Sequence, residues 1–108
     1  MAAAPDIIVI GSGIVGCSIA YELARRGATV GIVDDRGPAM GATQASAGVL
    51  APYIEAREGS ALLDLTVRGL SMWDEFVSRV SAESGQSIPY RRSGTLNLAQ
   101  DETELRGL

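Results

Sequence analysis

The sequence predicts an α/β fold that begins with a β-strand, a helix and a second β-strand. Ile7–Ile10 is continuously apolar and β-branched, as expected for a strand buried on both faces of a parallel sheet. A G-x-G-x-x-G motif follows directly, from Gly11 to Gly16. The stretch Thr29–Val33 then predicts a second strand, which ends at an acid, Asp34. Together these observations predict a Rossmann-like βαβ unit of the kind that binds a dinucleotide.

The three glycines of the motif have separate roles in this prediction. Gly11 permits the tight turn that leaves the strand, and Gly13 lacks the Cβ that would keep a pyrophosphate away from the backbone. Gly16 lets the following helix pack close to the sheet. That helix, expected over residues 14–26 and ended by Gly27, points its N–H groups and positive dipole end at the phosphates.

The acid at the end of the second strand completes the motif. Asp34 lies 18 positions after Gly16, close to the offset of about 20 expected for an acid that binds the adenosine ribose. A carboxylate there accepts a hydrogen bond from the 2′-hydroxyl and repels a 2′-phosphate, which disfavours NADP. The next acid, Asp35, either touches the adenosine or begins an exposed loop.

Composition limits the other classes of function. The chain has 108 residues, enough for one small domain, and 9 basic against 13 acidic residues give a net charge of −4. This balance gives no indication of a nucleic-acid partner. Histidine is absent, and the single cysteine, Cys17, excludes an internal disulfide and is expected to be a small core residue. Neither a signal peptide nor an integral membrane span is expected, so the predicted location is cytoplasmic.

A second informative segment spans residues 37–52. It consists almost entirely of small residues and has no sustained apolar period. Small side chains allow the backbone to approach a flat, extended ligand, so we interpret this segment as the second wall of a cofactor site. A flexible Gly/Ala/Ser loop is the alternative.

These motifs resemble the N-terminus of the D-amino-acid oxidase (DAO) family of FAD enzymes, and within it glycine oxidase and D-amino-acid dehydrogenase. The resemblance rests on the glycine motif 10–16, on residues 21–27, on the segments 41–43 and 45–50, and on the later stretch 93–99. It implies a flavoprotein that oxidises the C–N bond of a small amino acid or amine, of the glycine, D-amino acid or sarcosine type, to an imine by hydride transfer to FAD. It further implies that the residues that grip the substrate lie outside this stretch, so no catalytic residue is assigned.

The resemblance also implies which residues hold FAD. The turn 11–16 would cradle the pyrophosphate, Asp34 the ribose, and the small-residue segment the flavin. The implied cofactor-binding residues are Gly11, Ser12, Gly13, Ile14, Val15, Gly16, Asp34, Asp35, Ala42, Thr43, Ser46, Ala47, Gly48 and Val49. Family members with covalent flavin use histidine or cysteine links, and since Cys17 lies in the wrong place, FAD is expected to bind non-covalently.

The second half of the chain predicts a long helix over residues 60–84 with Ser60 as N-cap and Gly85 at its end. Its apolar stripe is expected to pack in the core, and its members are Leu63, Val67, Leu70, Trp73, Val77 and Val80. Thr95–Leu98 alternates polar and apolar residues and predicts a half-buried strand, which in the family begins an antiparallel substrate-domain sheet. A capping box at Asp101 and Glu104 predicts a further helix start.

We therefore expect residues 1–85 to be the N-terminal part of an FAD-binding domain and residues 86–108 the beginning of a substrate-binding domain. Too few strands are present for a doubly wound sheet, so the chain is expected to be truncated, and unstable without a homo-oligomer or a complementing polypeptide. Arg91 and Arg92 are interpreted as a solvated pair rather than a carboxylate clamp, and Tyr53 and Tyr90 as packing residues. An NAD-binding dehydrogenase module and a non-catalytic remnant or subunit stay open as alternatives.

Overall fold

The computed structural model describes residues 4–106, apart from the side chain of Glu55, and these fall into two compact units. Unit 1 is Met1–Val49 and unit 2 is Leu50–Leu108. The outermost residues of the two predicted domains, 1–3 and 107–108, lie outside the described part. The predicted boundary between residues 85 and 86 stays a prediction, because the compact units do not test it.

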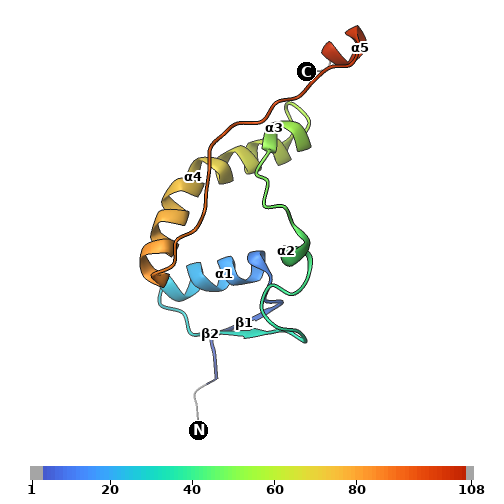
Figure 1. Cartoon of the computed structure of the whole chain (residues 1–108). Helices are drawn as coiled ribbons and strands as arrows, with labels where there is room; N and C mark the ends of the chain where they lie inside the picture. Colours follow the sequence, from blue (N-terminus) through green and yellow to red (C-terminus); the bar gives the residue numbers. More distant parts are fainter. Residues whose placement is uncertain (1–3, 107–108) are drawn as a thin grey trace. The chain divides into compact units, whose positions relative to one another are not determined.

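Unit 1 contains the predicted βαβ motif (Figure 1). Strand β1 (Ile7–Ile10) and strand β2 (Val30–Val33) pair in parallel, with Ile7 opposite Val30 and Ile10 opposite Val33. Helix α1 (Ile14–Arg25) connects them and packs against both. A short helix, α2 (Ala42–Ala45), follows β2. The register places the end of β2 beside the glycine turn, which positions the candidate site.

The core of unit 1 lies on one face of the two strands. Along β1, Ile7 and Val9 are half-buried, while Ile8 and Ile10 are exposed. The expectation that this strand is buried on both faces is therefore wrong for the described residues. The physical reason is that α1 covers one face only, whereas a parallel sheet buried on both sides needs helices on both.

A polar contact closes the start of the two strands. The N–H and hydroxyl groups of Thr29 both donate to Oδ2 of Asp6, over 2.8 and 2.5 Å, and the N–H of Asp6 donates to the hydroxyl oxygen of Thr29 over 3.0 Å. These bonds favour the ionised carboxylate and lower the pKa of Asp6, the side-chain bond from Thr29 having the largest effect. The contact fixes the register from which the far ends of the strands follow.

Unit 2 is built on the long helix α4 (Ala61–Ser84), preceded by the short helix α3 (Pro52–Glu55). The hydroxyl of Ser60 accepts a hydrogen bond from the N–H of Leu63, and Gly85 ends α4 in the left-handed conformation at φ 66°. Both predicted caps are confirmed. All six residues of the predicted apolar stripe are half-buried. Among the described residues, none of the helices is both long and apolar enough to span a membrane.

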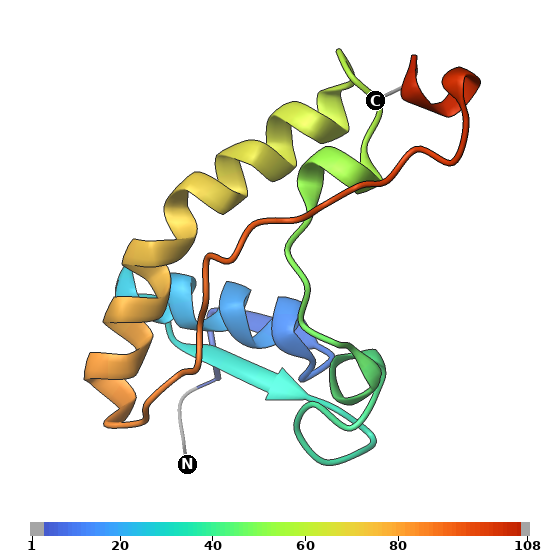
Figure 2. The same cartoon turned by 45° about the horizontal axis from the view of Figure 1, so that its top comes forward.

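Residues 86–100 run beside α4 without regular secondary structure (Figure 2). No strand forms at Thr95–Leu98, so that prediction is wrong, and residues 4–106 do not show the predicted antiparallel sheet. Leu96 and Leu98 are 82% and 74% exposed. The physical reason is that alternation makes a strand only where another strand accepts its hydrogen bonds, and none within residues 4–106 pairs with this segment.

The last helix, α5 (Glu102–Leu105), begins at the predicted capping box. The carboxylate of Asp101 accepts from the N–H groups of Thr103 and Glu104, over 2.8 and 2.9 Å. Glu104 reaches back to the N–H of Gln100, over 2.7 Å, one residue before the N-cap.

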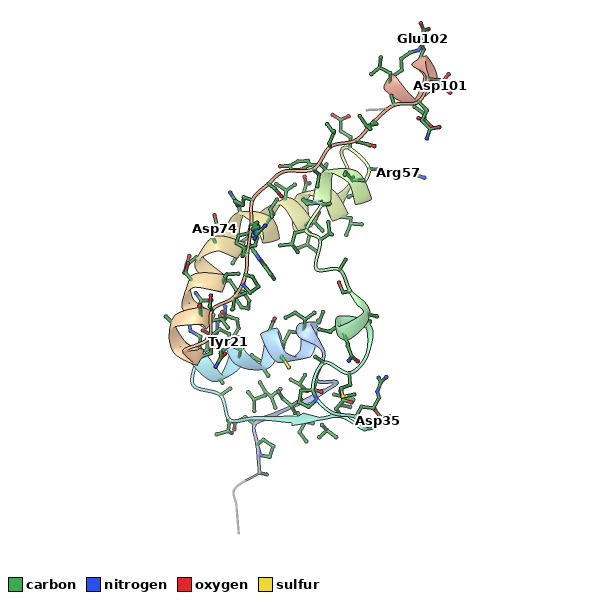
Figure 3. The ribbon with its side chains drawn as sticks, in the orientation of Figure 1. Tyr21, Asp35, Arg57, Asp74, Asp101 and Glu102 are labelled. Atoms are coloured by element: carbon green, nitrogen blue, oxygen red, sulfur yellow. The ribbon has the colours of Figure 1, made fainter. Side chains whose placement is uncertain are left out.

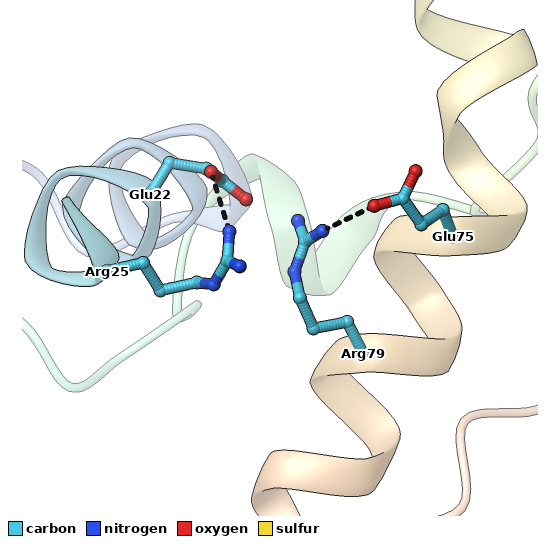
Figure 4. A network of polar contacts seen from close by, with 4 residues as sticks. All are labelled: Glu22, Arg25, Glu75 and Arg79. Carbon is cyan, nitrogen blue, oxygen red and sulfur yellow. Dashed lines mark hydrogen bonds and ion pairs between the residues drawn. The ribbon is translucent and has the colours of Figure 1, made fainter.

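Two ion pairs, Glu22 with Arg25 on α1 and Glu75 with Arg79 on α4, each lie within one helix (Figure 4). Each pair has an exposed partner, so its contribution to stability is small.

Candidate functional site

The candidate site begins at the glycine turn between β1 and α1. Gly11 has φ +102°, a conformation that side chains rarely adopt. A Cβ on Gly16 would lie 2.0 Å from the carbonyl oxygen of Gly11, which only glycine allows. Gly13 is the N-cap residue of α1 and has no side chain with which to cap it. The turn therefore brings its backbone to the first turn of the helix without an intervening side chain.

The first N–H groups of α1 are open toward an anion. The N–H of Ile14 donates to the hydroxyl oxygen of Thr43 over 2.9 Å. Within the part of the chain that the structure describes, no acceptor is paired with the N–H of Val15 or Gly16, and the side chain of Val15 is 70% exposed. Unpaired N–H groups at the positive end of a helix are a general site for phosphate.

The predicted ribose acid lies directly beside this turn. Oδ2 of Asp34 accepts hydrogen bonds from the N–H of Ser12, over 2.6 Å, and from its hydroxyl, over 2.8 Å. Oδ1 accepts from the N–H of Arg36 over 2.9 Å. These bonds lower the pKa of Asp34 far below its usual range. The backbone bond from Ser12 has the largest effect, and the backbone bond from Arg36 has the next largest. The carboxylate is therefore ionised at neutral pH.

Asp35 takes a smaller part in these contacts, because its side chain makes the smallest of the contributions that lower the pKa of Asp34. Its side chain lies near the end of β2 (Figure 3), is 88% exposed and forms an ion pair of 3.4 Å with Nε of Arg36. Of the two readings of Asp35, the exposed loop acid fits this geometry, and a contact with adenosine stays a prediction.

The small-residue segment meets the glycine turn at one point, Thr43. A Cβ on Gly13 would lie 3.1 Å from the hydroxyl oxygen of Thr43, so the two segments approach closely. Thr43 and Ala42 belong to α2, where Ala42 is exposed. Beyond α2, the hydroxyl of Ser46 accepts from the N–H of Gly48 over 3.0 Å, and Gly48 has φ +71°.

The predicted residues thus form two groups in unit 1. The structure joins the turn 11–16, Asp34 and Thr43 by hydrogen bonds. The exposed stretch 46–49 has no hydrogen bond to the turn among the described residues.

Two further contacts of the site were not predicted. The N–H of Ala39 donates to the carbonyl oxygen of Ser12 over 3.0 Å, and so does the thiol of Cys17, over 3.3 Å.

Other contacts of the site differ in whether the sequence indicates them. Aspartate commonly accepts a hydrogen bond from the N–H two residues ahead, so the bond from Arg36 to Asp34 could be predicted from the sequence. The bond from Ala39 to Ser12 could not be predicted from the sequence, because Ala39 takes φ +62°, which is unusual for a residue with a Cβ.

The candidate residues of unit 2 take part in packing. Nε of Arg92 lies 3.2 Å from Oδ1 of Asp74 and donates to the hydroxyl of Tyr90 over 3.2 Å, which together raise the pKa of Arg92, the bond with Tyr90 most. Tyr90 packs edge-on against Trp73, with ring centroids 6.4 Å apart. Tyr90 is thus confirmed as a packing residue, and Arg92 is paired within the protein rather than simply solvated. Tyr53 is exposed.

Comparisons with known proteins find related sequences. The chain is 30% identical over 98 residues to the uncharacterized oxidoreductase YurR of Bacillus subtilis (strain 168), covering 91% of this chain and 26% of that protein. It is 34% identical over 103 residues to the bifunctional protein ThiO/ThiG of Nostoc sp. (strain PCC 7120), covering 95% and 16%. It is 28% identical over 99 residues to the glycine oxidase of Geobacillus kaustophilus (strain HTA426), covering 92% and 26%.

The chain thus spans about a quarter or less of the length of these relatives. The family model described as FAD dependent oxidoreductase matches residues 6–108, nearly the whole chain. The chain therefore belongs to the DAO family of FAD-dependent oxidoreductases.

Proposed function

We propose that this chain is the FAD-binding part of an oxidoreductase that acts on the C–N bond of a small amino acid or amine. The observation that carries the proposal is the open N-terminus of α1. The N–H groups of Val15 and Gly16 have no acceptor among the described residues, while the hydroxyl of Thr43 caps the neighbouring N–H of Ile14. This arrangement fits a pyrophosphate, whose charge the helix dipole stabilises.

The ribose of the adenosine half would bind at Asp34. The carboxylate follows β2 directly and is held beside the turn by Ser12, so a hydroxyl of the ribose could donate to it while the pyrophosphate lies over α1. Because the low pKa of Asp34 keeps it charged, it would repel a 2′-phosphate. This supports FAD or NAD over NADP.

The flavin half would lie along residues 42–49. Thr43 already contacts the N–H of Ile14, which supports its place next to the pyrophosphate. Ala42, Ser46, Ala47, Gly48 and Val49 continue the segment as exposed small residues. The thiol of Cys17 donates to the carbonyl oxygen of Ser12 at the buried side of the turn, and this supports non-covalent binding of the flavin.

When bound, FAD would supply the redox chemistry by accepting a hydride from the carbon that bears the amine, which leaves an imine for hydrolysis. The final electron acceptor would be oxygen or a quinone. Relatives named glycine oxidase support the substrate class, a glycine, D-amino acid or sarcosine type of amine. The role of this chain's residues is to bind and orient the cofactor.

Cofactor binding is tested by equilibrium dialysis of the chain against FAD, NAD and FMN. We expect FAD to bind, ADP to compete with it, and Asp34→Asn to weaken it by roughly tenfold or more, since a charge-assisted hydrogen bond is lost. Tighter binding of NAD than of FAD would instead support a dehydrogenase module, and binding of neither would support a non-catalytic remnant.

The reaction class is tested in the absence of oxygen on an FAD-loaded protein that carries this chain together with a substrate-binding domain, because the isolated chain is expected to be inactive. Glycine, D-alanine or sarcosine is expected to bleach the absorbance of the oxidised flavin. Glycerol 3-phosphate is the matched control, because one relative is named glycerol 3-phosphate dehydrogenase. Bleaching by glycerol 3-phosphate and by none of the amines would contradict the proposed substrate class.

A further inference from the structure

Ser12 is the most constrained polar residue of the site. It is buried, with 6% of its surface exposed, and all of its polar groups are engaged within the protein. Its N–H and hydroxyl donate to Asp34, and its carbonyl oxygen accepts from Ala39 and Cys17. The N–H and hydroxyl proton of Ser12 therefore point at the carboxylate and not at the space over α1 where a phosphate would lie.

The bonds from Ser12 also decide what Asp34 can still accept. A carboxylate has about four lone-pair positions, two on each oxygen. The N–H and hydroxyl of Ser12 both bond to Oδ2, and the N–H of Arg36 bonds to Oδ1. Oδ1 is therefore the less occupied oxygen and can accept a hydrogen bond from a ligand, and the three bonds restrict rotation of the carboxylate about its side-chain torsions. Without the hydroxyl of Ser12, a ligand would have to order the carboxylate itself on binding.

We infer that Ser12 is a positioning residue, which holds Asp34 so that one lone pair of Oδ1 accepts a single hydroxyl of the adenosine ribose. This inference rests on the proposed function, because it needs an adenine nucleotide in the site. If Ser12 contacted the pyrophosphate directly, its removal would weaken every nucleotide that carries a pyrophosphate. If Ser12 positions Asp34, its removal should weaken only nucleotides that carry the ribose hydroxyl.

The test measures the affinity of the full chain for ADP and for 2′-deoxy-ADP, which share the pyrophosphate and differ in one ribose hydroxyl. Ser12→Ala removes the side-chain hydroxyl and keeps the backbone N–H bond to Asp34. Ser12→Gly removes the same hydroxyl and adds no atom to the turn, so it serves as a second variant. Ser78→Ala, at an exposed position of α4, is the matched control.

We expect both Ser12 variants to weaken the affinity for ADP by about fivefold, since Ser12 acts on the nucleotide only through Asp34, and to leave the affinity for 2′-deoxy-ADP as in the wild type. In an Asp34→Ala background, Ser12→Ala is expected to have no further effect on ADP. Retained affinity for 2′-deoxy-ADP also shows that the variants keep the phosphate site folded.

Three outcomes would count against the inference. Equal weakening of both nucleotides by both Ser12 variants would show that Ser12 acts on the phosphates or on the fold of the turn. Unchanged affinity for ADP would show that the hydroxyl positions nothing. Failure of the wild-type chain to bind ADP or FAD would overturn the proposed function and this inference together, whereas the first two results leave FAD binding intact.

Discussion

Gly16 and Gly11 approach so closely that a Cβ on Gly16 would lie 2.0 Å from the carbonyl oxygen of Gly11. Real Cβ atoms do not come this near to an oxygen. Because the opposing atom belongs to the backbone, the clash could be relieved only by moving the main chain. The approach lets the first turn of α1 begin directly above the turn that leaves β1. The geometry of the proposed phosphate site depends on it.

Gly16→Ala is expected to destabilise the chain by about 1–3 kcal/mol, as overpacking does, and to abolish FAD binding because the turn must open. Gly69→Ala is the matched control. Gly69 lies in α4 and a Cβ there would meet nothing within 4 Å, so alanine should stabilise by roughly 0.5–1 kcal/mol. Urea unfolding followed by circular dichroism measures both. A Gly16→Ala chain as stable as the wild type would contradict this account of the turn.

The pH dependence of stability follows from Asp34 and Asp6. The pKa of each is lowered in the folded chain from its usual 3.8, Asp34 chiefly by the N–H of Ser12 and Asp6 chiefly by the side chain of Thr29. A lowered pKa adds stability above the unfolded value, and this stability disappears as pH falls through the folded value. We expect the unfolding midpoint to be level above about pH 5 and to fall below about pH 4.

Asp34→Asn and Asp6→Asn separate the two contributions. Each variant is expected to be less stable than the wild type at neutral pH, with a gap that narrows as the pH is lowered below about 4, because the wild-type carboxylates then become protonated. Unfolding by urea at a series of pH values measures the gap. A gap of the same size at low and neutral pH would mean that the charge of these carboxylates is not what stabilises the chain.

The start of α4 depends on Ser60, whose hydroxyl accepts from the N–H of Leu63 over 3.2 Å. Ser60→Ala leaves that N–H without its cap and should cost about 1 kcal/mol. Ser78→Ala changes an exposed residue in the middle of the same helix and should be neutral or slightly stabilising. Circular dichroism on heating measures the loss of helix content in the two variants. Equal stability of Ser60→Ala and Ser78→Ala would contradict a stabilising role of the Ser60 cap.

Trp73, the single tryptophan, reports whether residues 86–92 stay beside α4. Tyr90→Ala removes the ring that packs on it and should shift its fluorescence to longer wavelength, as in a wetter environment. Tyr90→Phe keeps the ring and loses the hydroxyl that accepts from Arg92, so its shift should be small. Tyr53→Ala, at an exposed ring, should give no shift. An unchanged emission in Tyr90→Ala would contradict this packing.

The local elements of this fold were readable from the sequence, because each depends on residues close together in the chain. β1, α1, β2 and α4 lie within two residues of their expected bounds, and the cap at Ser60 was correctly identified. The short helix α2 was not predicted, because a helix of four residues is too short to show an apolar period. The strand predicted at Thr95–Leu98 does not form, because an alternating pattern does not indicate whether a neighbouring strand is present to pair with it.

The site was readable in part for the same reason. The motif 11–16 and the acid at Asp34 follow from spacing. The bonds between Asp34 and Ser12 join residues 22 positions apart and depend on the parallel register that sets Val33 opposite Ile10. The contact of Thr43 with Ile14 spans 29 positions, and nothing in either segment alone indicates it.

The most direct test of the proposed cofactor site is an amide NMR titration of the isotope-labelled chain with FAD, ADP and FMN. We predict that FAD shifts the N–H resonances of residues 13–16 and of residues 42–49. ADP should shift the first group and FMN the second. The account would be contradicted if FAD left the N–H groups of Val15 and Gly16 unmoved, or if all three ligands shifted the same residues.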